Sequence, residues 1–177
     1  MAAFPKTTRL KDFSELTLSM KSREDMADSL AFFRHQNPED ITFLRRDVTK
    51  RPVMETRIEE IEDGCAHVIL ARYGDRIIGD ALLYVAKKGW YCNTGEIRMV
   101  VDTDFRGKGL GTLMARELIE LAEEMGLTKL EATCMESQPG LIKTLKPLGF
   151  KLEGTLKDFV VDLEGKEHDL ILLGMKL

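Results

Sequence analysis

The sequence lacks three patterns that would place it quickly: paired cysteines, a long apolar run and an excess of basic residues. Its 3 cysteines, Cys65, Cys92 and Cys134, are odd in number and widely spaced, so no disulfide framework or zinc-ligand spacing is visible. No apolar run approaches the ~20 residues of a membrane-spanning helix. The segment from Met1 to Lys11 has no apolar stretch of the signal-peptide kind. These absences predict a cytoplasmic protein without a membrane or metal partner.

The charge balance argues against a further class of protein, the nucleic-acid binders. The formal net charge is −4 and the pI is about 5.5, whereas nucleic-acid binders usually carry a basic stripe. With 44% hydrophobic and 32% charged residues in 177, the composition is typical of one soluble globular domain. We expect a flexible lead-in over residues 1–13 and a single domain over 14–177.

Apolar periodicity and turn formers predict one order of elements. Strands are predicted over 15–20, 67–72, 76–85, 96–101, 129–134, 149–161 and 168–176, and helices after Ser22, Pro38 and Pro52, over 110–125 and over 139–145. Some strands are joined by tight turns, and one pair is joined through the long helix as a crossover. This order predicts an α/β fold in which helices flank a central mixed β-sheet.

Three glycines follow the strand over 96–101 and precede the longest predicted helix: Gly107, Gly109 and Gly111. Amides at a helix start lack intrahelical acceptors and lie at the positive end of the helix dipole. Because glycines let an anion approach these amides closely, the turn is a candidate pyrophosphate site. Arg106 and Lys108 add positive charge there.

Several interpretations compete for this turn. A P-loop requires Ser or Thr after Gly-Lys, but Gly109 follows Lys108. The dinucleotide pattern G-x-G-x-x-G fits Gly107 and Gly109 but meets Thr112 at its third glycine, and the counterpart of its ribose-binding acid, Glu131, falls inside a strand. A strand–helix connection without any ligand is the structural alternative.

A third phosphate-binding motif fits better. Arg106-x-x-Gly109-x-Gly111 after a Val-Val-Asp strand is similar to the signature of the GNAT superfamily of acyl-CoA N-acyltransferases. Leu148-Gly149-Phe150 resembles a second hallmark of that family, and the order of elements matches over roughly residues 14 to 177. The chain around Glu96 resembles the bacterial protein lysine acetyltransferases of the superfamily.

This resemblance implies a binding mode for acetyl-CoA as co-substrate. The pyrophosphate would lie on the amides of the glycine turn, and a splayed or bulged strand would hold the pantetheine arm. The amide of Met99 or Val101 would polarise the thioester carbonyl. The implied cofactor-binding residues are Met99, Val100, Val101, Arg106, Gly107, Lys108, Gly109, Leu110, Gly111, Thr112 and Gln138, with no metal.

Glu96 is the candidate catalytic residue. A lysine-like amine has a pKa near ~10.4, so presenting it neutral at pH 7 costs roughly 4.6 kcal/mol, and a carboxylate can take that proton. Glu96 lies ten residues before Arg106, at an offset matching the catalytic glutamate of the lysine acetyltransferases. The alternative is a solvated glutamate or one paired with Arg98.

The chain departs from the family pattern at two positions. Many members carry an Asn near position 138 and, near 145, a Tyr that protonates the leaving thiolate; this chain has Gln138 and Leu145. Gln138 retains hydrogen-bonding capacity, whereas Leu145 has no proton to donate. Water, Tyr84 or Tyr91 would replace the tyrosine, or the thiolate would leave unaided, since a free thiol has a pKa near ~8.5.

The sequence therefore predicts an N-acetyltransferase that moves an acetyl group from acetyl-CoA to a primary amine by direct attack. The acceptor is a protein lysine or a small amine, and a homodimer is compatible with the sequence. A non-catalytic acyl-CoA-binding module is the alternative function. Two residues keep two interpretations each: Cys134 is a buried core thiol or lies on the thioester path, and His168 is a surface turn residue or lines the acceptor side.

Overall fold

The computed structural model describes residues 4–12, 14–42, 44–162 and 164–177. The strands are β1 (Lys6–Arg9), β2 (Glu15–Met20), β3 (Ala66–Tyr73), β4 (Arg76–Val85), β5 (Thr94–Val101), β6 (Lys129–Met135), β7 (Lys151–Val161) and β8 (Glu167–Lys176). The helices are α1 (Met26–His35), α2 (Pro38–Thr42), α3 (Arg51–Glu62), α4 (Leu110–Glu124) and α5 (Pro139–Leu145), with short 3₁₀ turns at Arg23–Asp25, Thr103–Phe105 and Lys146–Leu148.

The predicted elements are confirmed, with one addition. Ser22 caps the turn before α1, and its capping box with Asp25 is complete. Within the segment expected to be a flexible lead-in, Lys6–Arg9 forms β1 and pairs with β2. The ammonium of Lys6 also pairs with the buried carboxylate of Glu117 on α4. Lys6–Arg9 is too short for apolar periodicity to predict a strand. Its formation depends on pairing with β2, which a local pattern does not reveal.

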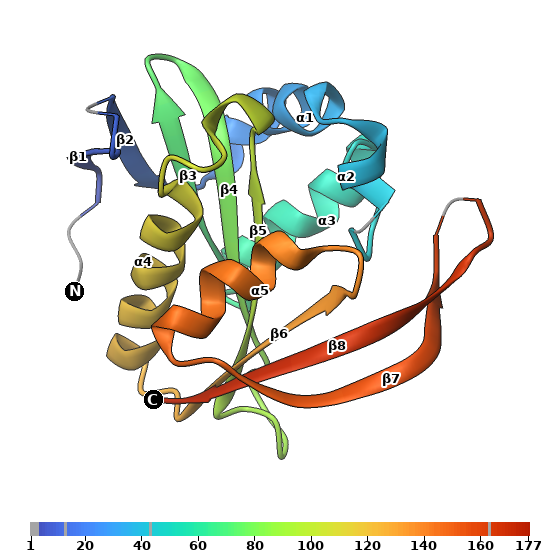
Figure 1. Cartoon of the computed structure of the whole chain (residues 1–177). Coiled ribbons are helices and arrows are strands. Elements are labelled where there is room, and N and C mark those ends of the chain that lie inside the picture. Colours follow the sequence, from blue (N-terminus) through green and yellow to red (C-terminus); the bar gives the residue numbers. More distant parts are fainter. Residues whose placement is uncertain (1–3, 13, 43, 163) are drawn as a thin grey trace.

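One mixed sheet organises the described chain, with eight strands in the order β1-β2-β3-β4-β5-β6-β8-β7. Only the β5–β6 pair is parallel, because α4 connects those two strands as a crossover. One core lies between the sheet and the helices α4 and α5, and a second lies under α1 and α3. Figure 1 shows these helices on the two faces of the sheet. None of the described helices has the length and apolar character needed to cross a membrane.

The sheet opens between β5 and β6. Their parallel pairing covers only Thr94–Glu96 on β5 and Lys129–Glu131 on β6, although both strands continue further. Beyond Glu96 and Glu131 the strands separate, and α5 lies in front of the opening (Figure 1). The splay expected near Met99–Val101 is thus present.

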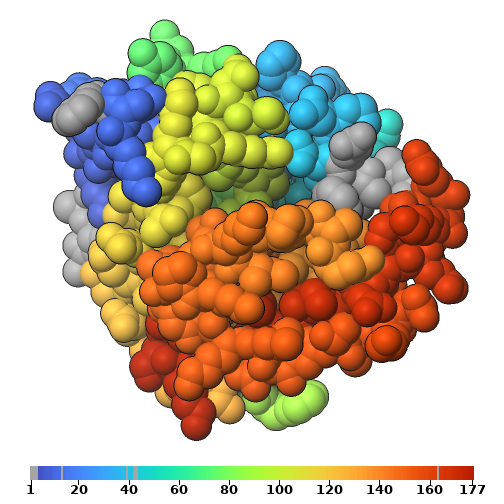
Figure 2. Space-filling view, viewed as in Figure 1, coloured from blue at the N-terminus to red at the C-terminus, as the bar shows by residue number. Residues whose placement is uncertain are grey.

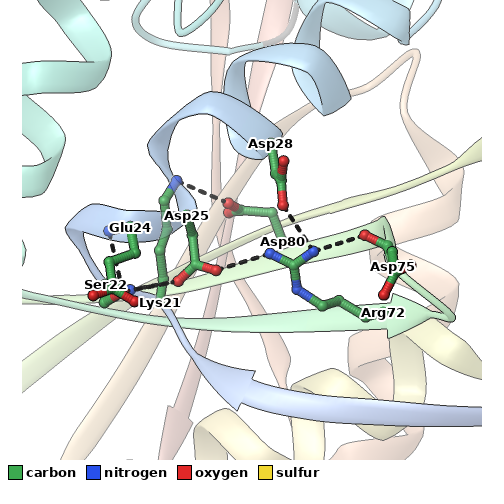
Figure 3. A network of polar contacts seen from close by, with 8 residues as sticks. All are labelled: Lys21, Ser22, Glu24, Asp25, Asp28, Arg72, Asp75 and Asp80. Carbon is green, nitrogen blue, oxygen red and sulfur yellow. Dashed lines mark hydrogen bonds and ion pairs between the residues drawn. The ribbon is translucent and has the colours of Figure 1, made fainter.

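A polar network fixes the start of α1 to the sheet. The guanidinium of Arg72 pairs with Asp25 at 2.8 Å and Asp28 at 3.0 Å, and it also donates to the carbonyl of Asp75 at 2.8 Å. Beside it, the buried ammonium of Lys21 lies 3.7 Å from a carboxylate oxygen of Asp80 (Figure 3). These contacts hold α1 over the face of the sheet on which Glu96 lies.

Gly95, directly before Glu96, lies in a tightly packed part of β5. A Cβ at this position would lie 2.6 Å from Leu83, 2.9 Å from Leu127 and 3.0 Å from Leu130. We expect Gly95→Ala to lower the free energy of unfolding by about 1–3 kcal/mol, because three core side chains must move. Urea denaturation measures this.

Gly140 on α5 provides the matched control. A Cβ there meets nothing within 4 Å, so Gly140→Ala should stabilise by roughly 0.5–1 kcal/mol through the lower helical cost of alanine. Equal stability of the two variants would contradict the packing at Gly95.

Candidate functional site

The opening between β5 and β6 is lined by backbone amides of β5. The amide of Asp102 donates to the carbonyl of Ile78 on β4 at 2.9 Å. Because alternate residues of an antiparallel strand face the same neighbour, Val100 also turns its peptide groups to β4, whereas Met99 and Val101 face the opening. Both amides that the sequence proposed as carbonyl donors therefore point into the gap, and the amide of Val100 does not.

The glycine turn before α4 has the expected backbone geometry. Gly109 is the N-cap of α4 with φ 93°, a left-handed conformation that favours glycine, and Gly107 also has a positive φ of 74°. Within the described part of the chain, Leu113 is the first residue of α4 whose amide meets a carbonyl, that of Gly109 at 3.0 Å. The amides from Gly107 to Thr112 are thus left for an anion, as expected at a helix start.

The two cations of this turn are paired with carboxylates. Arg106 pairs with Asp40 on α2 at 2.8 Å, and its Nε donates to the carbonyl of Val101 at 3.0 Å. Lys108 pairs with Asp12 at 3.1 Å. An incoming polyanion would compete with these carboxylates for the two side chains.

Glu96 lies at the last position of β5 that pairs with β6, and it is held by two arginines. Its side chain is 10% exposed. Arg98 donates from Nε and from a terminal nitrogen to the two carboxylate oxygens, both at 2.9 Å. Arg45, which follows α2, adds contacts of 3.2 and 3.4 Å. The pairing with Arg98 that the sequence offered as an alternative is present, and it leaves Glu96 on the wall of a cavity.

That cavity has a volume of about 230 Å³ and is lined by both charged and aromatic side chains. They are Arg45, Tyr84, Tyr91, Glu96 and Glu131, with Ala86 and Thr94. A larger cavity of about 410 Å³ lies between α1 and the β3–β4 turn and contains none of the predicted site residues. On the face shown in Figure 2, the surface is also hollowed between the turn before α4 and α5.

Glu131 differs from Glu96 in its partners. Glu131 is the register partner of Glu96 across the parallel pair, and it accepts a hydrogen bond from the hydroxyl of Tyr91. This carboxylate raises the pKa of Tyr91 to about 12. Because the hydroxyl of Tyr91 already donates to Glu131 and has a raised pKa, it is a poor proton donor to a leaving thiolate.

Two of the remaining candidates, Leu145 and Cys134, are buried, and Gln138 is half-buried. Leu145 is fully buried in the core under α4 and α5, and Gln138 accepts from the amide of Met135 at 3.2 Å, which fixes the end of β6. Cys134 is buried, and desolvation raises its pKa to about 11, as is usual for a thiol in a core. In the described residues, no group of His, Cys, Asp and Glu is arranged to hold a metal ion.

His168 is buried between two carboxylates rather than exposed in a surface turn. Its Nδ1 lies 3.1 Å from Glu136, just after β6, and its Nε2 lies 2.8 Å from Asp162, just after β7. These contacts, first with Asp162 and then with Glu136, raise the pKa of His168. The imidazole ring thereby ties the β7–β8 hairpin to the end of β6.

The contacts of His168 with Asp162 and Glu136 predict a pH dependence of stability. Because the folded pKa exceeds the unfolded value near ~6.5, the stabilisation is complete below about pH 6.5 and disappears as the pH rises through the folded pKa. We expect the melting temperature of the wild type to fall more than that of His168→Gln between pH 6 and pH 9. An equal fall in melting temperature for the two proteins between pH 6 and pH 9 would contradict this stabilisation.

The sequence did not point to Arg45 or to the position of Glu131 opposite Glu96. Arg45 lies 51 positions from Glu96 in a segment without a motif, and nothing in the local sequence could have placed it. Glu131 was considered only as a ribose ligand. Its alignment with Glu96 depends on the register of a parallel pair, which the crossover sets.

Comparison with known proteins defines the class. The model of the acetyltransferase (GNAT) family matches residues 24–150, so the chain belongs to this family. It is 30% identical over 87 residues to the putative phosphinothricin acetyltransferase YwnH of Bacillus subtilis, covering 49% of this chain and 53% of that protein. It is 23% identical over 99 residues to the L-amino acid N-acetyltransferase AaaT of Escherichia coli, covering 55% and 60%.

Among solved structures, the GNAT domain of S. lividans PAT has the same fold. The TM-score is 0.81 at 13% identity, covering 100% of this chain and 99% of that one. The curated relatives YwnH and AaaT are matched over little more than half of their length. The family and the fold are thus defined, and the reaction is a matter for proposal.

Proposed function

We propose that this protein is an acetyl-CoA-dependent N-acetyltransferase that acetylates a small primary amine by direct attack in a ternary complex. The observation that carries the proposal is the opening of β5 from β6 beside the glycine turn. It aims the amides of Met99 and Val101 into one gap, close in sequence to the unpaired amides of Gly107 to Thr112.

We propose that the glycine turn and β5 hold coenzyme A. The amides of Gly107, Lys108, Gly109, Leu110, Gly111 and Thr112 would hold the pyrophosphate, with Arg106 and Lys108 adding charge once released from Asp40 and Asp12. The amide of Met99 or Val101 would stabilise the developing oxyanion. Gln138, beside the end of β6, would face the pantetheine arm. Bound acetyl-CoA supplies the acetyl thioester.

Glu96 is the group we propose to accept the proton of the amine. It lies on the cavity wall, and Arg98 fixes its carboxylate. Leu145 is buried and Tyr91 is bound to Glu131. We therefore propose that the thiolate takes a proton from water or from Tyr84, which lines the same cavity, or leaves unaided. The raised pKa of Cys134 favours direct attack over an acyl-enzyme.

The small cavity favours a small acceptor over a protein lysine. Its volume of about 230 Å³ lies below the ~300–1,000 Å³ of drug-sized ligand pockets. The relatives named for phosphinothricin and L-amino acids point the same way. Arg45, with 49% of its side chain exposed, could pair with the carboxylate of an amino acid.

Two measurements test the proposal. Calorimetry should show that coenzyme A binds and that NAD does not compete. Thiol release should exceed hydrolysis for at least one member of a panel of amino acids, their amides, polyamines and lysine peptides. Binding without turnover across that panel would favour the non-catalytic module, and turnover of lysine peptides alone would overturn the small acceptor.

A further inference from the structure

We propose that Glu131, oriented by Tyr91, binds the ammonium group of the acceptor in the cavity beside Glu96. This inference rests on the proposed function, since it assigns a part of the same acceptor site. The ligand class is a primary ammonium ion. Glu131 would bind the amine, and Glu96 would take its proton.

Position is the first argument. Glu96 and Glu131 are directly opposite in the parallel register, at the last pair before β5 and β6 separate. Paired residues project to the same face of a sheet, and both line the cavity of about 230 Å³. An amine held at Glu131 would therefore lie next to Glu96 and at the mouth of the gap that receives the amides of Met99 and Val101.

Charge is the second argument. The carboxylate of Glu96 is contacted by the guanidinium groups of both Arg98 and Arg45. Glu131, by contrast, has the hydroxyl of Tyr91 as its partner, and no lysine or arginine of the described ranges pairs with it. It is the carboxylate of this cavity whose charge is left for a ligand to neutralise, and a partly buried carboxylate attracts a cation more strongly than one in water.

The geometry of the partners is the third argument. A tyrosine hydroxyl donates one hydrogen bond, so the carboxylate of Glu131 keeps free acceptor positions, while a primary ammonium brings three donors and no acceptor. The remaining contact of Arg45, at 2.8 Å to Thr133 on β6, holds its guanidinium beside the same wall. A bulky or anionic head group would meet Arg45 rather than Glu131, so the amine is the group that fits at this position.

Binding of a simple amine tests the inference without acetyl transfer. We would titrate the ¹⁵N-labelled protein with n-butylammonium chloride and, separately, with n-butanol, its neutral analogue. The ammonium should change the chemical shifts of the backbone amides around Tyr91 and Glu131, whereas butanol should not. Glu131→Gln should weaken the ammonium effect about tenfold or more. Glu123→Gln, which removes one exposed carboxylate from α4, should leave it unchanged.

Kinetics separates the two carboxylates once an acceptor is known. Glu131→Gln should raise the KM of the amine about tenfold with a smaller change in kcat, whereas Glu96→Gln should lower kcat. An ammonium response that is equal in the wild type and in Glu131→Gln overturns the inference while the proposed function stands. Failure to bind coenzyme A overturns the proposed function, while the butylammonium titration still reports on Glu131.

Discussion

Glu96→Gln should lower kcat/KM for the amine by about 10²–10⁴-fold, the contribution typical of a general base. The amide of glutamine can keep a hydrogen bond to Arg98 but cannot take a proton from the acceptor. The affinity for coenzyme A should be unchanged, because the proposed cofactor contacts come from the backbone of β5 and the glycine turn. Steady-state kinetics over pH 6–9 and calorimetry with coenzyme A measure the two quantities.

Two controls make this prediction specific. Glu123→Gln on the exposed face of α4 removes the same charge and should retain wild-type turnover. A melting curve of Glu96→Gln shows whether the variant stays folded, since it leaves the guanidinium groups of Arg98 and Arg45 without their carboxylate. Full turnover by the folded variant at every pH would remove Glu96 from the reaction.

Asp80→Asn should lower the free energy of unfolding by about 3–5 kcal/mol, the cost of leaving buried charge without its partner. Asp80 on β4 has 3% of its side chain exposed, accepts from Arg57 at 2.5 Å and lies 3.7 Å from the ammonium of Lys21. One carboxylate thus faces two cations in the core under α1 and α3 (Figure 3 shows its contact with Lys21). Urea denaturation at pH 7 measures the loss.

Lys21→Met is the informative companion. Burial lowers the pKa of Lys21 to about 8, so the folded state binds fewer protons than the unfolded state between about pH 8 and 10.5, and wild-type stability should rise with pH across that window. Methionine should cost much less than Asp80→Asn, because the ion pair of Asp80 with Arg57 remains, and it should flatten the pH dependence. A loss as large as that of Asp80→Asn would mean that the ammonium itself is required.

Most of the secondary structure was predictable because its signals are local. Ser22 and Asp25 form the expected capping box, Gly109 takes the left-handed conformation expected at the start of α4, and the apolar spacing of the long helix becomes one side of a core. Each of these features depends on residues within about two helical turns, where periodicity and capping chemistry act. The strand β1 escaped prediction because its stability comes from pairing with β2 and from the contact of Lys6 with Glu117.

By itself, the sequence determined the order of elements, the glycine turn, the family resemblance and Glu96 as a candidate. The tertiary structure decided where β5 leaves β6, which amides face the opening, and which of two adjacent carboxylates is already neutralised. Arg45 reaches Glu96 across 51 positions and Tyr91 reaches Glu131 across 40. Such partners are set by sheet register and packing rather than by local pattern, because charges in a cavity interact through space, whatever their separation along the chain.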